Sequence, residues 1–338
     1  MRVEPVISDL PEAPRLLVIC VARFGDTLLI TPTLAALKQR WPRCHLTVLA
    51  HPGRRGILEN LPFIDRLGVM TKRLAPWCGR LHTRTYDAAI VYGDDLPLFA
   101  YARRVAKAVI GFAGDEAVRR ACLTYSVPRP IGPTPAAFER ALLLSPFGLA
   151  AADLHLHYSV SAQEAAAAFA YVIKAGWSER RLVGLQLQSF PSKVYRDWPP
   201  GHFSELATTL LARYSDIQIL LLGGPESADL AQRLADDLGD RVSSTAGCFS
   251  MRENAAMLAH LALYIGVDTG PTHLAGALDI PMVALYHCFH PGYLLAPQGH
   301  RALTVIEHPA QQPERSASMA DIPVATVLKA ACAYLDKS

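Results

Sequence analysis

One stretch of the chain combines a backbone pattern and side chains that suit the binding of an anion. The turn Asp268–Gly270 follows an apolar, β-prone run at 263–267 and precedes Pro271. Proline is favoured at the start of a helix, where its missing N–H costs no hydrogen bond. The sequence therefore predicts a strand, a tight turn and a short helix over 272–278. The N–H groups of such a helix start, at the carboxyl end of a strand, can hold a diphosphate without a metal ion.

The same turn has a simpler interpretation, because Asp and Thr are also common helix caps. Other nucleotide-binding patterns do not compete with it. Gly223 and Gly224 follow a predicted strand, but the chain contains neither G-x-G-x-x-G nor G-x-x-x-x-G-K-[ST]. The absence of these two motifs argues against an NAD enzyme and a P-loop NTPase. The G-x-S-x-G pattern of the α/β-hydrolases is missing as well.

The elements that must position this turn alternate between strands and helices along the chain. Apolar runs predict strands at 16–21, 45–50, 86–92, 108–112, 182–188, 217–222, 242–244, 263–267 and 282–286. Helical spacing predicts helices at 27–40, 54–60, 96–105, 135–144, 161–175, 203–214, 227–238, 251–261, 272–278 and 324–335. Such alternation is typical of parallel α/β sheets. We expect two Rossmann-like halves joined near residue 160.

Charge is divided unevenly between the two halves. Residues 1–150 hold 20 Lys+Arg against 12 Asp+Glu, a net charge of +8, and the remaining residues carry −5. The first half is therefore expected to attract an anionic partner or a membrane surface. An alternative is that these cations only solvate helix faces. Nucleic acid is not expected as a partner, because the basic residues are not interleaved with aromatics.

Cysteine usage and hydrophobicity indicate the compartment. Seven cysteines, an odd number without a C-x-x-C pair, fit free thiols in a reducing environment. No apolar run approaches the roughly 18–20 residues of a membrane span. Residues 1–14 carry acids and prolines and lack the basic-then-apolar pattern of a signal peptide. The sequence predicts a cytoplasmic protein, with peripheral contact at the inner face of the cytoplasmic membrane as an option.

Four stretches together resemble glycosyltransferase family 9, the ADP-heptose lipopolysaccharide heptosyltransferases. They read RFGDTLLITP at 23–32, RDWP at 196–199, LLGGPE at 221–226 and GVDTGPTH at 266–273. The resemblance implies the GT-B fold, α/β with two Rossmann-like domains facing a central cleft. It assigns the acceptor to residues 1–160 and the nucleotide sugar to residues 161–338, with the last helix, 323–336, packing back on the N-terminal domain.

The resemblance also assigns the catalytic pair. Asp26 matches the family's catalytic base, and a carboxylate there can take the proton of an acceptor hydroxyl. Its alternative role is to cap the following helix. Arg196 stands where many members carry a lysine near the diphosphate, and a guanidinium keeps that charge. Lys193, three residues earlier, is an alternative for the same role. Trp198 is expected in the core.

Seven positions match the family's donor site, counting Lys193. Glu226 is expected to bind the ribose hydroxyls; alternatively it is an exposed residue at a helix start. Phe249 is expected to pack beside the adenine; alternatively it is a buried core residue. Within the turn, Thr269 and Gly270 are expected to donate to phosphate oxygens. Asp268 is expected to hold the loop or to bind a sugar hydroxyl. His273 is expected either to contact a phosphate or sugar or to be a structural histidine.

One loop departs from the family pattern. Family members often carry Gly-Pro-Thr/Ser-Asp-Pro after the strand that ends at Tyr286, whereas this chain has His287 to Gly292. The loop contains two histidines and a cysteine, which raises a metal site as an alternative, but no fourth ligand is evident. The adjacent carboxylates Asp94 and Asp95 diverge, so a loop or cap role is expected for them.

The leading prediction is an inverting, metal-independent glycosyltransferase with no cofactor. It would move a heptose or related sugar from an ADP-sugar, expected to be ADP-heptose, to an anionic lipopolysaccharide-core acceptor. One alternative is a protein heptosyltransferase of the autotransporter-modifying type. The other is a nucleotide-sugar-binding protein without turnover.

Overall fold

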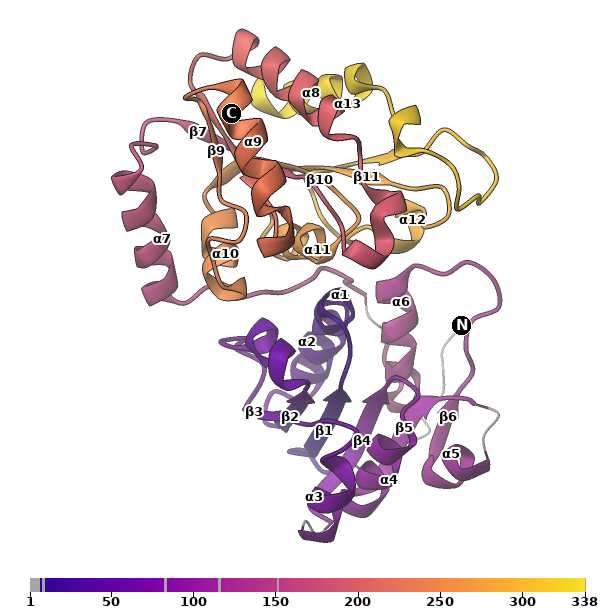
Figure 1. Ribbon diagram of the computed structural model, residues 1–338. Coiled ribbons are helices and arrows are strands. Elements are labelled where there is room, and N and C mark those ends of the chain that lie inside the picture. The colour runs from indigo at the N-terminus through magenta and orange to yellow at the C-terminus, as the bar shows by residue number, and fades with distance from the viewer. Residues whose placement is uncertain (1–6, 8–9, 82–83, 115–116, 151, 338) are drawn as a thin grey trace. The chain divides into compact units, whose positions relative to one another are not determined.

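The computed structural model describes residues 7, 10–81, 84–114, 117–150 and 152–337. Most of residues 1–9, which belong to the N-terminal segment discussed above, therefore lie outside the described residues. The chain divides into two compact units, Met1–Ser159 and Val160–Ser338. Each unit is built on its own parallel sheet flanked by helices (Figure 1). The prediction of two Rossmann-like α/β domains is confirmed, whereas the roles assigned to the two halves stay predictions.

The first unit contains a six-stranded parallel sheet in the order β3-β2-β1-β4-β5-β6. Its strands are β1 Arg15–Cys20, β2 His45–Ala50, β3 Arg66–Val69, β4 Tyr86–Tyr92, β5 Ala106–Phe112 and β6 Tyr125–Val127. Along β1 the side chains alternate between the faces, and Leu17 and Ile19 join the core formed with α3 and α4. This continuous burial explains why β1, β2 and β4 were readable as apolar runs.

The helices of the first unit are α1 Phe24–Leu28, α2 Thr31–Arg40, α3 Ala75–Leu81, α4 Leu96–Val105, α5 Ala117–Cys122 and α6 Ala136–Ala141. Two segments are 3-10 helices, Pro52–Leu58 and Leu142–Phe147. The stretch 27–40 does not form one continuous helix, because α1 and α2 are separated by a turn, and α2 begins at Thr31 with Pro32 in its first turn. The helix predicted at 135–144 ends early, and a 3-10 segment containing Pro146 follows it. Proline lacks the N–H that a longer α-helix needs.

The second unit contains another six-stranded parallel sheet, in the order β12-β11-β10-β7-β8-β9. Its strands are β7 Arg181–Gln186, β8 Ile217–Leu222, β9 Val242–Ser244, β10 Leu261–Val267, β11 Met282–Tyr286 and β12 Leu303–Glu307. Because β7, β10 and β11 are neighbours in this parallel sheet, the segments that leave their carboxyl ends lie next to one another. Those segments carry residues 187–197, 268–270 and 287–291.

The helices of the second unit are α7 Ala162–Lys174, α8 Pro200–Arg213, α9 Ala228–Leu238, α10 Met251–Leu258, α11 Gly270–Ala277, α12 Gly292–Leu295 and α13 Val324–Leu335. Three short 3-10 segments are Pro191–Arg196, Pro225–Ser227 and Met319–Asp321. Helix α7 begins with a capping box formed by Ser161 and Glu164. No helix in the described part of the chain is both long enough and apolar enough to cross a membrane.

Helix α13 contacts α8, β10 and β11 of its own unit. Val327, Ala331 and Leu335 are buried in the core of the second unit. Trp198 is fully buried in the same core, and its indole N–H donates to the carbonyl of Ile322 at 3.0 Å, which confirms its core assignment. Packing of the last helix on the first unit stays a prediction.

Candidate functional site

Asp26 lies on α1, the short helix that follows β1. The N-cap of α1 is Arg23, the N-cap of α2 is Ile30, and neither helix has a side-chain cap hydrogen bond. Asp26 therefore caps neither helix, and the capping interpretation does not explain it. Its side chain is 34% exposed, which leaves the carboxylate open to a ligand.

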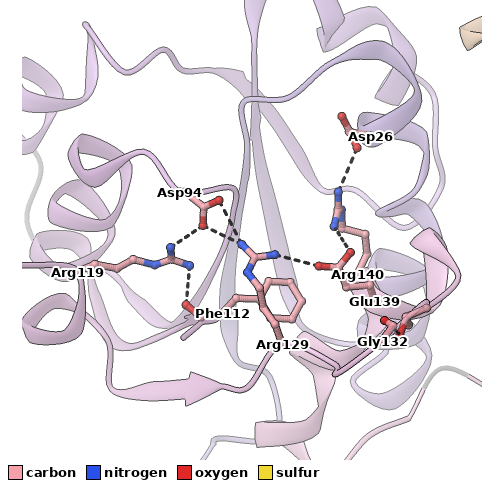
Figure 2. A network of polar contacts seen from close by, with 9 residues as sticks. Asp26, Asp94, Phe112, Arg119, Arg129, Gly132, Glu139 and Arg140 are labelled. Carbon is pink, nitrogen blue, oxygen red and sulfur yellow. Dashed lines mark hydrogen bonds and ion pairs between the residues drawn. The ribbon is translucent and has the colours of Figure 1, made fainter. Parts of the chain in front are cut away.

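The carboxylate of Asp26 is held by Arg140 from α6 (Figure 2). Arg140 Nη2 donates to Asp26 Oδ1 at 3.1 Å, and Nη1 donates to Glu139 Oε2 at 3.1 Å. Burial opposes the charge on Arg140, but the attraction of Asp26 and Glu139 outweighs it and raises the pKa of the guanidinium. Arg140 therefore remains a cation beside Asp26 at any working pH and fixes its orientation.

Further ion pairs extend this contact away from Asp26 (Figure 2). Arg129 donates to Glu139 Oε1 at 2.9 Å and to Asp94 Oδ1 at 2.8 Å. Arg119, buried in the unit, donates to Asp94 Oδ1 at 2.5 Å and to the carbonyl of Phe112 at 2.6 Å. Positive and negative side chains thus alternate from Arg119 to Asp26. Arg119 and Arg129 are therefore paired with carboxylates of their own unit.

The two adjacent carboxylates of the sequence have different partners. Asp94 belongs to this network, whereas Asp95 is the N-cap residue of α4 and lies 3.5 Å from Lys72 Nζ. The expectation that the two side chains diverge into loop and cap positions agrees with these contacts. Neither carboxylate is paired with the other for acid–base chemistry.

The predicted strand–turn–helix forms the second part of the candidate site. Strand β10 ends at Val267, Thr269 is the N-cap residue, and Gly270 opens α11 with Pro271 in its first turn. Thr269 is half-buried, and its side chain makes no cap hydrogen bond, so the hydroxyl is not used to close the helix. The N–H of Gly270 and this hydroxyl can donate to phosphate oxygens, whereas Pro271 has no N–H and the N–H groups of Thr272 and His273 already donate to the carbonyl of Thr269.

Two buried hydroxyl groups hold the turn between β10 and α11 in place. Thr272 Oγ1 donates to the carbonyl of Val267 at 2.5 Å, and it lies 3.0 Å from the hydroxyl of Tyr264. Both side chains are fully buried. Because buried hydroxyl groups are costly when unpaired, these bonds hold the end of β10 and the start of α11 in one arrangement.

Asp268 forms an ion pair with Arg196, the cation matched by the family motif. Arg196 ends the segment that follows β7, so the contact follows from the neighbouring positions of β7 and β10 in the sheet. The Asp268 side chain is 5% exposed and the Arg196 side chain 14% exposed. Asp268 thus holds the loop of Arg196, and the Arg196 charge is already largely compensated.

Tyr195 brings further cations to the same place. Lys193 Nζ lies 5.8 Å, Arg196 Cζ 5.6 Å and Arg315 Cζ 4.9 Å from the centre of its ring. His290, from the loop after β11, lies 6.0 Å away and tilted against the same ring. Distances below about 6 Å allow cation–π attraction. The second unit therefore carries three cations around one aromatic ring beside the start of α11.

His287 is a structural histidine. It is fully buried, its Nε2 lies 2.9 Å from the carbonyl of Ala317, and its Nδ1 accepts from the N–H of Phe289 at 3.0 Å. Burial lowers the pKa of the ring, which keeps it neutral. Both ring nitrogens are thus engaged by the backbone, and the described residues contain no group of three His, Cys, Asp or Glu that could hold a metal ion.

The three remaining predicted donor residues lie in different surroundings. Glu226 is exposed in the short 3-10 segment after β8. Phe249 is half-buried and packs edge-to-face on Tyr171 from α7, with ring centres 5.1 Å apart. His273 is buried on α11. No ligand role follows from these positions alone.

The second unit brings together Lys193, Arg196, Asp268 and the start of α11, whereas Asp26 belongs to the first unit. Sequence reasoning did not identify Arg140, Tyr195 or Arg315. The sequence carries no local signal for Arg140, because its partner lies 114 positions away. Tyr195 lies in the sequence between Lys193 and Arg196, two predicted site residues, and this position was the sequence signal that could have identified it.

Comparison with known proteins gives a consistent result. The sequence model of glycosyltransferase family 9 (heptosyltransferase) matches residues 78–321, more than half of the chain. Lipopolysaccharide heptosyltransferase 3 of Escherichia coli is 25% identical over 280 residues, which cover 78% of this chain and 80% of that protein.

Solved structures share the fold. The glycosyl transferase family 9 structure from Veillonella parvula has a TM-score of 0.82 at 20% identity, covering 97% of this chain and 100% of that one. The E. coli heptosyltransferase WaaC with ADP has a TM-score of 0.73 at 19% identity, covering 95% and 99%. The GT-B type fold expected from the sequence agrees with these likenesses.

Proposed function

This chain belongs to glycosyltransferase family 9, the heptosyltransferases, and from that premise we propose that it moves a heptose or related sugar from an ADP-sugar to a lipopolysaccharide-core acceptor. The observation that supports the donor class best is the cation group beside the start of α11. Lys193 and Arg196 both lie at the ring of Tyr195, and Arg196 pairs with Asp268, the residue directly before the N-cap Thr269 and the N–H of Gly270. This arrangement is suited to a diphosphate.

The proposed reaction is a single displacement with inversion. Asp26 accepts the proton of the acceptor hydroxyl as that oxygen attacks the anomeric carbon. The bond from the anomeric carbon to the diphosphate oxygen breaks, and its electron pair leaves with ADP. Attack from the face opposite the leaving group inverts the configuration. Arg140 holds the Asp26 carboxylate in one orientation, because its guanidinium bonds both Asp26 and Glu139.

The leaving diphosphate gains negative charge as the bond breaks. We assign its stabilisation to Lys193, to the Thr269 hydroxyl and to the N–H of Gly270. Arg196 contributes a second cation, held in place by Asp268. This arrangement supplies positive charge without a metal ion or another cofactor, so the reaction is proposed to be metal-independent.

The nucleoside part of the donor is assigned to the carboxyl ends of β8 and β9. Glu226, exposed after β8, is proposed to accept from the ribose hydroxyls. Phe249, before α10, is proposed to pack beside the adenine. His273 is proposed to support the phosphate or sugar from within α11.

The acceptor is proposed to bind the first unit at the cytoplasmic side of the inner membrane. Residues 1–150 carry a net charge of +8, and a lipopolysaccharide core acceptor is anionic, so the charges are complementary. Seven scattered cysteines, all free among the described residues, fit a reducing compartment. Peripheral contact with the membrane surface would follow from a membrane-embedded acceptor.

Nucleotide-dependent thermal stabilisation tests the donor assignment. We expect ADP and ADP-heptose to raise the melting temperature and UDP and GDP to have no effect. A shift with UDP or GDP alone would exclude the ADP-heptose donor. For the mechanism, Asp26→Asn should abolish sugar transfer while ADP binding persists. Full transfer by Asp26→Asn would exclude Asp26 as the base, and ADP binding by the wild-type chain without turnover would indicate a non-catalytic member.

A further inference from the structure

Arg315 lies on the segment between β12 and α13, and three side chains hold this segment in place. Cys288 Sγ lies 3.3 Å from the carbonyl of Glu314, and His287 Nε2 lies 2.9 Å from that of Ala317. His308 Nε2 lies 2.9 Å from the next carbonyl, that of residue 318. The two histidines follow β11 and β12 and are buried. Arg315 is therefore presented by a segment fixed to the carboxyl end of the sheet.

The Arg315 side chain turns toward the ring of Tyr195. Its Cζ lies 4.9 Å from the ring centre, the shortest of the three cation–ring distances there. Tyr195 stands between Lys193 and Arg196, so the ring joins the loop after β7 to the segment after β12. Arg315 is also exposed to solvent. The guanidinium can therefore be reached by a ligand at this edge of the sheet.

A count of charges shows that cations outnumber anions in the cluster. Arg196 is paired with Asp268. Lys193 and Arg315 make no ion pair with any residue that the structure describes. Two cations therefore remain uncompensated at the same ring. Like charges held close together are unfavourable unless an anion joins them, so the arrangement suits a ligand with two negative charges.

We propose that Arg315 is a donor-binding residue that contacts the diphosphate together with Lys193. The proposal rests on the proposed function, which supplies a nucleoside diphosphate sugar carrying one negative charge on each phosphoryl group. Lys193 and Arg315 are the two uncompensated cations opposite these charges, and Arg196, held by Asp268, adds a charge that is already partly compensated. A guanidinium suits this role because it can donate two parallel hydrogen bonds to a phosphate.

A simpler role for Arg315 is to pack on Tyr195 and stabilise its own segment. The two roles differ in their dependence on ligand charge. A phosphate contact affects ADP binding and leaves adenosine binding unchanged, because adenosine has no phosphate. A packing role lowers the melting temperature and affects both ligands to the same extent.

The test is calorimetric titration of the full chain with ADP, AMP and adenosine at low and high salt. The variants are Arg315→Gln, Arg315→Lys and the control Arg301→Gln, which removes another exposed arginine of the same unit. We expect Arg315→Gln to weaken ADP binding about 10- to 100-fold, the loss of a charge-assisted hydrogen bond. Adenosine affinity should not change, Arg315→Lys should retain most of the ADP affinity, and Arg301→Gln should match the wild type.

Each result decides a separate point. ADP affinity in Arg315→Gln equal to that of the wild type would overturn the role of Arg315 and leave the proposed function standing. Equal weakening of ADP and adenosine would assign Arg315 a packing role. Failure of the wild-type chain to bind any of the three ligands would overturn the proposed function and this inference with it. If Arg315→Gln does not fold, Arg315→Lys and the salt dependence of wild-type ADP binding remain decisive.

Discussion

Arg140 Nη2 lies 3.1 Å from Asp26 Oδ1, although the two residues are 114 positions apart in the sequence. The other arm of the same guanidinium is bound to Glu139. Glu139 is in turn bound to Arg129, so the cation beside Asp26 is itself held from a second side. A carboxylate fixed in this way has one orientation from which to accept a proton.

Replacement of Arg140 by methionine should reduce turnover more than ligand affinity. We expect kcat for sugar transfer to fall about 10- to 100-fold, because a misplaced base loses the alignment that the reaction needs. The dissociation constant for ADP should stay unchanged, since the donor residues belong to the second unit. Steady-state kinetics with both substrates varied, together with ADP titration, measures the two effects separately.

Arg140→Lys and Arg103→Met are the matched comparisons. A lysine keeps the charge but cannot hold Asp26 and Glu139 with a fork, so partial recovery of kcat is expected. Arg103, exposed on α4, should be replaceable without effect. An unchanged kcat in Arg140→Met would show that Asp26 needs no partner.

The hydroxyl pair under the donor turn should contribute to stability. Thr272→Val removes the bonds to Tyr264 and to the carbonyl of Val267, and it leaves buried polar groups unpaired. We expect the free energy of unfolding of the second unit to fall by about 1–3 kcal/mol. Urea denaturation followed by fluorescence measures the change, and Thr208→Val on exposed helix surface is the control.

A double-mutant cycle tests whether the two hydroxyls act together. Tyr264→Phe in the Thr272→Val background should cost less than in the wild type, because its partner is already gone. Strict additivity of the two losses would mean that the 3.0 Å contact contributes nothing.

The fold was predictable where burial is continuous. The bounds of β2, β4, β8, β9 and β11 and of helices α4 and α13 agree with the apolar runs and helical stripes of the sequence. The strands that were missed, β3, β6 and β12, are at or near the sheet edges and are partly exposed. A half-exposed strand of three to five residues has no apolar run that distinguishes it from a loop.

The candidate site was predictable only as separate contiguous motifs. The turn after β10 and the cation before Trp198 could be recognised, but their contact depends on β7 lying beside β10. Likewise, nothing local connects Arg315 to Tyr195, because the contact requires β12, β11, β10 and β7 in that order. Partners of this kind follow from sheet order, which the spacing of residues along the chain does not specify.

The ion pair between Glu164 and Arg252 should make stability depend on acid pH. Arg252 Nη2 donates to Glu164 Oε2 at 2.7 Å, and the Glu164 carboxylate also completes the capping box with Ser161. The bond from Arg252, together with those from Ser161, lowers the pKa of Glu164 from 4.5 to about 2. A carboxylate with a depressed pKa stabilises the fold fully above its unfolded value. The contribution is lost as the pH falls from about 4.5 toward 2.

Glu164→Gln should therefore lower the free energy of unfolding by about 1–3 kcal/mol at pH 7. The difference from the wild type should shrink as the pH falls below about 4.5, because protonation removes the same charge in the wild type. Chemical denaturation at pH 7 and pH 3 measures both values, with exposed Glu179→Gln as the control. A pH-independent difference would assign the effect to the cap alone.

His290 should report on anion binding at the cation cluster. Burial and the nearby charges of Arg196, Lys193 and Arg315 lower its pKa from 6.5 to about 4. The ring is therefore neutral in the folded chain, and its contribution to stability is present above pH 6.5 and lost as the pH falls toward 4. A bound diphosphate would offset the cations and favour the protonated ring. NMR titration, with His290→Asn to assign the signal, should show the pKa of His290 rising by about one unit with ADP and staying unchanged with adenosine. Only ADP brings negative charge to these side chains. The same change in the pKa of His290 with ADP and with adenosine would therefore mean that the diphosphate binds elsewhere.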